Sequence, residues 1–134
     1  MYVYFNPNPA KKIVGDCVIR GICKLIGDDW ETTYTHIIVQ GYKMFDMPSS
    51  NSVWGTYLKN NGYLREVIPC SDMSEEVSKS HCTIKDFCRK HPKGKYLVAT
   101  GSHVVAVVNG DYYDTWDSGD EIPIYFWRKE ELDE

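Results

Sequence analysis

Apolar positions follow two different periods along this chain, one in each half. Up to about residue 91 they recur at the spacing of amphipathic helices, and beyond residue 95 they form β-branched and aromatic runs separated by glycines. The first pattern predicts helices at 17–26, 28–47, 51–60 and 83–91. The second predicts strands at 95–100, 103–108, 111–116 and 122–128, with one earlier strand at 63–68.

Helices followed by strands indicate an α+β fold class, with N-terminal helices packed on a C-terminal antiparallel β-sheet. We expect one domain over residues 1–134, with a helical half at about 17–91 and a sheet half at about 95–128. The last four strands have the turn spacing of an antiparallel meander. Segment 6–9 is expected to be a surface arm, because each proline keeps the residue before it extended.

Capping residues mark the starts of the predicted helices. Asp16 is the expected N-cap of the first helix, and Arg20 is expected on the side of that helix that faces away from the core. Asp28 with Glu31 matches a capping box at the start of the second helix, and the pair at 83 and 86 matches one at the fourth.

Composition favours a packed protein without a nucleic-acid or membrane partner. Of the 134 residues 43% are hydrophobic, the net charge is -4, and no run of lysine or arginine occurs. The chain shows neither the charged and apolar start of a secretion signal nor a stretch long enough to span a bilayer, so we expect a cytoplasmic protein. Five cysteines, an odd number without framework spacing, predict mostly free thiols rather than disulfides.

The most informative cysteine is Cys17, at the start of the first predicted helix. Unpaired backbone N–H groups at a helix N-terminus stabilise a thiolate, the nucleophilic form of cysteine. A thiol nucleophile also needs a base, and His103 is the only one of the four histidines in a strongly predicted strand of the sheet. The sequence therefore predicts Cys17 as a nucleophile and His103 as its base.

The turn at 109–110 predicts the third member of the site. Asn-Gly favours a two-residue type I′ hairpin, whose length fixes the register of the two flanking strands. With that register Tyr112, Asp114 and Trp116 share the face of His103, and Asp114 is diagonal to it. A carboxylate there is within reach of the imidazole, which it would orient as in a catalytic triad.

These residues resemble the papain-like (clan CA) cysteine peptidases. Segment 114–117, Asp-Thr-Trp-Asp, looks like the Asn-Ser-Trp-Gly motif of papain, and Gly15-Asp16-Cys17 before an apolar helix looks like the segment around the papain cysteine. The order of elements is similar to the compact C39-like and NlpC/P60-like members and to small phage and bacterial papain-like proteins. At the level of order and spacing the resemblance covers most of the chain. It implies a papain-like fold, with Trp116 covering the histidine–acid hydrogen bond.

An oxyanion site requires two donors. The backbone N–H of Cys17 supplies one. The resemblance implies a glutamine six residues earlier as the other, but Lys11 occupies that position, so Asn6, Asn8 and Lys11 stay open as alternatives. Asp16 places a negative charge next to the thiol, which opposes thiolate formation.

Tyr112, Trp116 and Asp16 are the candidates for lining a substrate groove. The expected function is that of a cysteine hydrolase, a peptidase or amidase that cleaves an amide bond through a thioester acyl-enzyme without a cofactor. Its expected substrates are peptides, isopeptides or other amides. Two alternatives stay open: a papain-like protein-binding module with an inactive triad, and an acyltransferase or transglutaminase-like activity of the same triad.

Zinc binding is the competing chemistry. The chain has enough possible ligands in its later part, Cys70, His81, Cys82, Cys88 and His91. None of them forms a Cys-x-x-Cys pair or a recognised finger spacing, so no metal site is predicted.

Overall fold

The computed structural model describes residues 1–68 and 83–130. Within them the helices are α1 (Cys17–Ile26), α2 (Trp30–Met44), α3 (Asn51–Asn60) and α5 (Ile84–Lys90). The strands are β1 (Tyr2–Tyr4), β2 (Tyr63–Val67), β3 (Lys95–Ala99), β4 (Val104–Val108), β5 (Asp111–Asp114) and β6 (Tyr125–Lys129). The α+β class is confirmed, and every predicted helix and strand has a counterpart within a few residues.

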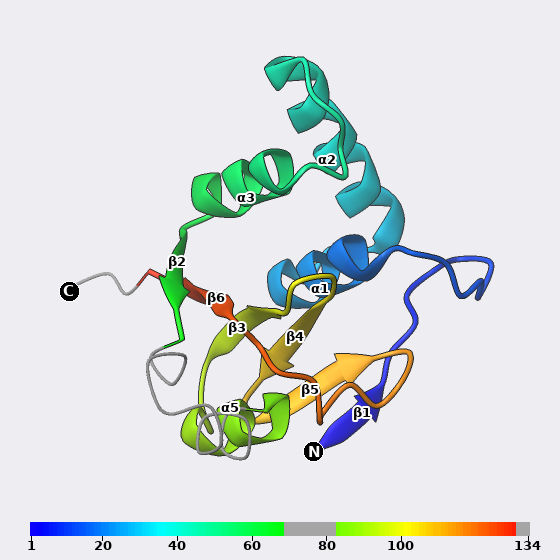
Figure 1. The fold of residues 1–134 in the computed structure, drawn as a ribbon. Helices are drawn as coiled ribbons and strands as arrows, with labels where there is room; N and C mark the ends of the chain where they lie inside the picture. Colours follow the sequence, from blue (N-terminus) through cyan, green and yellow to red (C-terminus); the bar gives the residue numbers. More distant parts are fainter. Residues whose placement is uncertain (69–82, 131–134) are drawn as a thin grey trace.

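One six-stranded sheet, in the order β1-β5-β4-β3-β6-β2, forms the centre of the protein (Figure 1). The prediction of a purely antiparallel meander is wrong in two respects. The last strand, β6, pairs with β3 instead of β5, because the chain crosses one end of the sheet after β5. The short first strand, which was not predicted, pairs in parallel with β5 and continues in a hydrogen bond of 2.9 Å from the N–H of Phe5 to the carbonyl of Asp114.

The hairpin between β4 and β5 has the predicted register. Val108 pairs with Asp111 and Val107 with Tyr112, and both turn residues have positive φ, 50° at Asn109 and 82° at Gly110. These are the backbone angles of the two-residue turn that Asn-Gly favours. His103 lies just before the first residue of β4, at the end of the loop 100–103 that follows β3.

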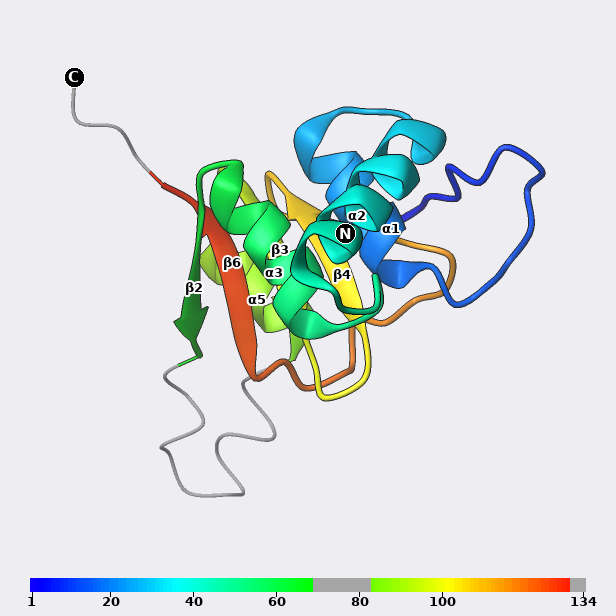
Figure 2. The same ribbon diagram turned by 90° about the horizontal axis from the view of Figure 1, so that it is seen from above.

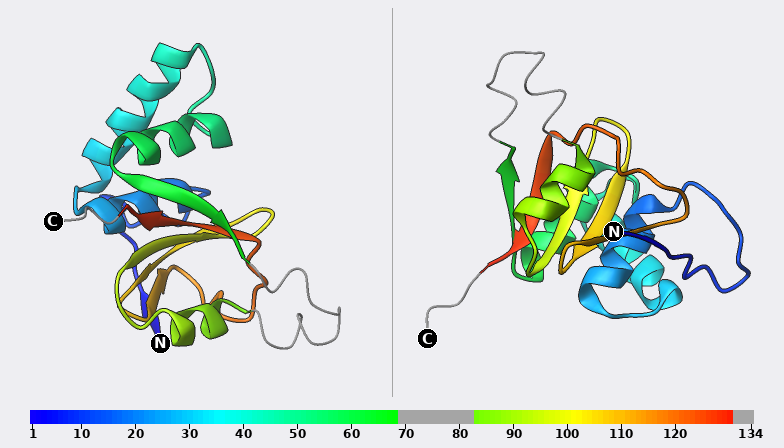
Figure 3. Two further views of the ribbon diagram at one scale, coloured as in Figure 1. Left: turned by 90° about the vertical axis from the view of Figure 1, so that its left-hand side faces the viewer. Right: turned by 90° about the horizontal axis from the view of Figure 1, so that it is seen from below.

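Helices cover both faces of the sheet, as Figures 2 and 3 show. On one face α1, α2 and α3 pack on alternate strand residues such as Leu97 and Ala106. On the other face helix α5 packs on the intervening residues, among them Val98 and Val105. This alternation follows from the period of two in a strand. No helix among the described residues is both long and apolar enough to cross a membrane.

Two of the predicted caps differ in the structure. The second helix is capped by Asp29, whose side chain accepts from the N–H of Thr32 at 2.7 Å, and not by the pair Asp28 and Glu31. Asp16 occupies the N-cap position of α1 but its side chain caps no N–H group there. The capping box at the start of α5 is present as predicted.

Candidate active site

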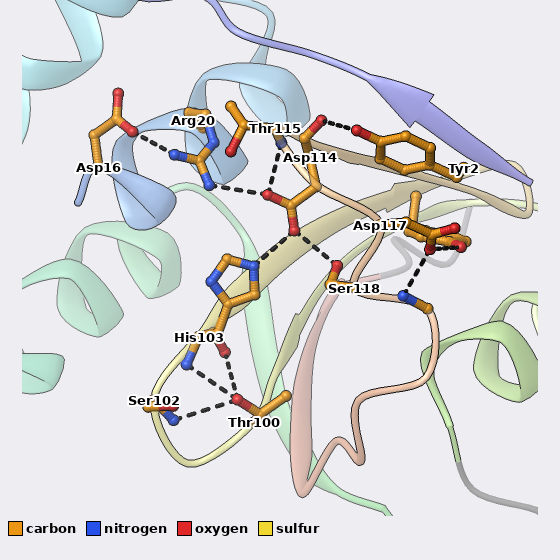
Figure 4. A network of polar contacts seen from close by, with 12 residues as sticks. Tyr2, Asp16, Arg20, Thr100, Ser102, His103, Asp114, Thr115, Asp117 and Ser118 are labelled. Carbon is orange, nitrogen blue, oxygen red and sulfur yellow. Dashed lines mark hydrogen bonds and ion pairs between the residues drawn. The ribbon is translucent and has the colours of Figure 1, made fainter. Parts of the chain in front are cut away.

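Three elements bring Cys17, His103 and Asp114 to one place. Cys17 is the first residue of α1, which packs across β4 and β5. His103 precedes β4, and Asp114 is the last residue of β5, so the neighbouring strands present the imidazole and the carboxylate side by side (Figure 4). The hairpin register is what makes these two residues neighbours.

The carboxylate of Asp114 is at the centre of the polar network in Figure 4. It is 1% exposed, and its oxygens lie 2.6 Å from His103 Nε2, 2.7 Å from Ser118 Oγ, 2.8 Å from the N–H of Thr115 and 3.0 Å from Arg20 Nη2. Burial alone raises the pKa of a carboxyl group, but the hydrogen bonds from His103 and Ser118 outweigh it and lower the pKa of Asp114. The group is therefore held as an anion.

The imidazole of His103 is fixed between this carboxylate and the thiol. Its Nε2 is bonded to Asp114, which leaves Nδ1 for Cys17. The backbone N–H of His103 donates to Thr100 Oγ1 at 3.0 Å, and the Trp116 ring lies against the imidazole at a centroid distance of 5.0 Å. Burial opposes protonation, but hydrogen bonds to Asp114 and Cys17 outweigh it and raise the pKa of His103 to about 9.

The thiol of Cys17 responds in the opposite direction. Burial of this half-buried side chain raises its pKa, but hydrogen bonds from His103 and from the backbone of Val104, together with the charges of His103 and Arg20, lower the pKa overall. A raised histidine pKa beside a lowered cysteine pKa favours transfer of the thiol proton to the imidazole. The favoured state of the pair is therefore thiolate and imidazolium.

Arg20, like Ser118, is a residue of this site that sequence reasoning missed. It was expected to face solvent, yet it is 4% exposed and lies between two carboxylates, pairing with Asp16 and, at 3.0 Å, with Asp114. The other oxygen of Asp16 accepts from Trp30 Nε1 at 2.9 Å. The spacing of Asp16 and Arg20 by four residues is a signal for an ion pair on a helix. Asp16 was expected to oppose the thiolate of Cys17. The buried guanidinium of Arg20 balances the negative charge of Asp16, so this opposition is weakened.

The start of α1 leaves its own N–H groups without a side-chain cap, since Asp16 is directed to Arg20 instead. The backbone N–H of Cys17 therefore keeps the position expected of an oxyanion donor.

The three candidates for the second oxyanion donor lie elsewhere. Asn8 Oδ1 accepts from the N–H of Ala10 at 2.9 Å, Asn6 Nδ2 donates to the carbonyl of Lys12 at 3.3 Å, and Lys11 Nζ lies 3.5 Å from the carbonyl of Asn6. All three therefore bond within their own loop, and none lines the cavity beside the thiol.

The three groove candidates have different surroundings. Trp116 is 45% exposed against His103, and Asp16 lines a cavity of about 420 Å³ next to the thiol. Tyr112 is 1% exposed in the core below α5, where its hydroxyl donates to Asp117. The expectation that Tyr112 lines a groove is therefore wrong, because its side chain fills the opposite face of the sheet.

Three of the zinc candidates, Cys70, His81 and Cys82, lie outside the described residues. The other two have structural contacts: Cys88 is buried in α5, and His91 stacks on Phe87 at a centroid distance of 4.0 Å. No group of three or more metal-binding side chains occurs in residues 1–68 and 83–130.

Comparison with known protein families, with curated proteins and with solved structures finds no match to this chain.

Proposed function

We propose that this protein is a papain-like cysteine hydrolase that cleaves an amide bond, with Cys17 as nucleophile, His103 as general acid and base, and Asp114 as the residue that orients the imidazole. The observation that carries the proposal is the buried carboxylate 2.6 Å from an imidazole whose other nitrogen is left for a thiol at a helix N-terminus. A structural role for these side chains accounts for each separately. It does not explain why the thiol, the imidazole and the carboxylate lie next to one another in space in the order that a catalytic triad requires.

The first half of the proposed reaction forms an acyl-enzyme. The thiolate of Cys17 attacks the carbonyl carbon, forming a C–S bond and moving the carbonyl π electrons onto oxygen, where the N–H of Cys17 stabilises the charge. Collapse of this intermediate breaks the C–N bond. The imidazolium of His103 gives its Nδ1 proton to the departing nitrogen, and the amine leaves.

The second half restores the enzyme. Neutral His103 takes a proton from water while the water oxygen attacks the thioester carbon. Collapse breaks the C–S bond and releases the acid, with the sulfur again a thiolate beside the imidazolium. Through both halves Asp114 remains ionised and keeps Nε2 protonated, which leaves Nδ1 to exchange the proton.

Alkylation by limiting iodoacetamide tests the proposal without knowledge of the substrate. At pH 6.5 about one ordinary thiol in a hundred is ionised, so a thiolate paired with imidazolium reacts far ahead of the others. Peptide mass spectrometry is expected to find the label on Cys17 first, and His103→Ala is expected to slow it roughly 10- to 100-fold.

The matched control is His36→Ala, which removes an exposed histidine that contacts Tyr57 on the helical layer. It should leave the labelling rate of Cys17 unchanged. Earlier labelling of another cysteine, or equal rates in the His103→Ala and unsubstituted proteins, would overturn the proposal.

A further inference from the structure

A cavity of about 420 Å³ opens directly beside Cys17 and His103. It lies between the first turn of α1, the inner sides of α2 and α3 and the loop 100–103. Most of its walls are apolar side chains, chiefly Val18, Ile19, Ile37, Ile38, Trp54 and Tyr125. Its position means that any group attached to the attacked carbonyl comes within reach of these walls.

The charge of the cavity excludes an ionic occupant. Among residues 1–68 and 83–130 no lysine, arginine or glutamate lines it, and the carboxylate that does, Asp16, has both oxygens engaged by Arg20 and Trp30. A charged side chain entering here would lose its hydration, which is costly, and the ionised groups that face it, Asp16, Cys17 and His103, already have partners. An uncharged apolar side chain gains free energy from the same burial.

The cavity also has the size and the access that a large group needs. A cavity of about 150 Å³ already holds benzene, so the volume here accommodates an aromatic ring with room for adjacent atoms. At Gly15 and Gly101, which flank the thiol and the imidazole, an added Cβ would meet nothing within 4 Å. A substrate backbone can therefore approach the sulfur past both glycines.

We infer that this cavity binds a bulky uncharged side chain, aromatic or branched aliphatic, in the acyl part of the substrate. The acyl part is favoured because it stays bonded to Cys17 in the thioester, within reach of the walls next to that residue. This inference rests on the proposed function and narrows its substrate class to amides of large apolar acyl groups.

The test uses N-acetyl-aminoacyl chloromethyl ketones that differ only in one side chain: benzyl, isobutyl, hydrogen, carboxymethyl or aminobutyl. Rate constants for alkylation of Cys17 are each divided by the rate with iodoacetamide, which has no side chain to bind. The benzyl and isobutyl reagents are expected to react roughly 10- to 100-fold faster than the hydrogen reagent. The two charged reagents are expected to react no faster than the hydrogen reagent.

Two adjacent residues of α2 give a matched pair of variants. Ile38 is 41% exposed and lines the cavity, whereas Val39 is 43% exposed and does not. Ile38→Lys is expected to cut the benzyl preference roughly tenfold and to speed the carboxymethyl reagent, because it puts a cation at the wall. Val39→Lys is expected to change neither and should keep the iodoacetamide rate.

The possible failures are distinguishable. Equal rates for all the chloromethyl ketones, or equal effects of the two lysine variants, would overturn the inference. The proposed function would still stand if iodoacetamide labelling of Cys17 depended on His103. A Cys17 that is inert to all reagents overturns the function. The cavity is then judged by NMR titration of the Cys17→Ala protein with N-acetylphenylalaninamide against N-acetylaspartamide: selective shifts at Ile38 support the apolar site, and their absence refutes it.

Discussion

The two faces of the sheet each carry a cysteine on a helix, and the two thiols have opposite character. Cys17, the first residue of α1, is half-buried beside an imidazole and a buried arginine, and its pKa is lowered. Cys88, within α5, is 4% exposed among apolar side chains, and burial raises its pKa to about 11. The two cysteines thus differ in pKa because one lies at a helix N-terminus beside charged groups and the other lies inside a helix among apolar side chains.

The acidic residues of the two faces repeat the contrast. Asp114 is buried and bonded to His103 and Arg20, so it belongs to an ionic network. Asp117 accepts a hydrogen bond from Tyr112, whose own pKa is raised by burial and by that contact. The first face has a charged centre that ends at the thiol, whereas the second face has an apolar core at whose edge the hydroxyl of Tyr112 donates to Asp117.

Removing the buried cation should have the largest effect. Arg20→Met leaves Asp16 and Asp114 without their common partner, which is expected to cost about 3–5 kcal/mol of unfolding free energy in urea titrations at pH 7. On the other face Tyr112→Phe should cost only about 1 kcal/mol. Similar losses in the two variants would remove the distinction between the faces.

The next largest effect is expected in thiol reactivity. At pH 7 Cys17 should react with iodoacetamide roughly a hundredfold or more faster than Cys88, since the pKa of Cys88 is about 11 and that of Cys17 is lowered. Cys23 serves as the control on the same helix as Cys17, because burial raises its pKa as well. Equal rates at Cys17 and Cys23 would show that the start of α1 confers no reactivity.

The dependence of stability on pH provides a third test. The folded-state pKa of His103, about 9, exceeds its unfolded value of about 6.5, so its contribution is complete below pH 6.5 and is lost as the pH rises to about 9. Cys17, with a lowered pKa, titrates in the opposite sense, so the proton that it loses on folding offsets part of the proton that His103 retains.

The free energy of unfolding of the unsubstituted protein should therefore fall less between pH 6.5 and 8.5 than that of Cys17→Ala. Cys17→Ala should lose on the order of 1–2 kcal/mol over the same interval, because only the histidine then titrates. Denaturant titrations across this interval measure both. Equal slopes in the two proteins would contradict the pairing of the thiol with the imidazole.

The smallest effect concerns packing. Cys88→Ala and Cys23→Ala should each lower the free energy of unfolding by about 1 kcal/mol. Both side chains are 4% exposed, so each substitution leaves a space in the core. Cys17→Ala, at a half-buried position, should change the free energy of unfolding at pH 7 by less than about 0.5 kcal/mol. Thermal or urea unfolding of the three variants measures the difference.

Sequence reasoning worked where local geometry decides the outcome. The Asn109-Gly110 turn fixed the pairing of β4 with β5, and this pairing makes His103 and Asp114 neighbours. The ends of α1 followed from its apolar spacing and from Gly27, whose left-handed backbone closes the helix. Such signals lie within a few residues of the feature that they predict.

It failed where the partner lies far along the chain. Arg20 looks like a solvent-facing residue because its second carboxylate is 94 residues away. Tyr112 was assigned to the groove because it alternates in phase with Asp114, but two residues earlier along β5 its side chain packs in the core below α5, away from the cavity beside the thiol. The crossing from β5 to β6 was missed because no local pattern records which sheet edge a returning strand joins.

The bond from Phe5 to the carbonyl of Asp114, at 2.9 Å, has a consequence for how the protein is made. Synthesis on the ribosome releases the opening strand and the cysteine helix long before residues 103–114 emerge. The growing polypeptide therefore carries a cysteine of ordinary acidity, because its imidazole does not yet exist. The pKa of Cys17 is lowered only when β4 and β5 have joined the sheet and His103 lies beside the thiol. The reactive form of the cysteine therefore arises only as folding is completed.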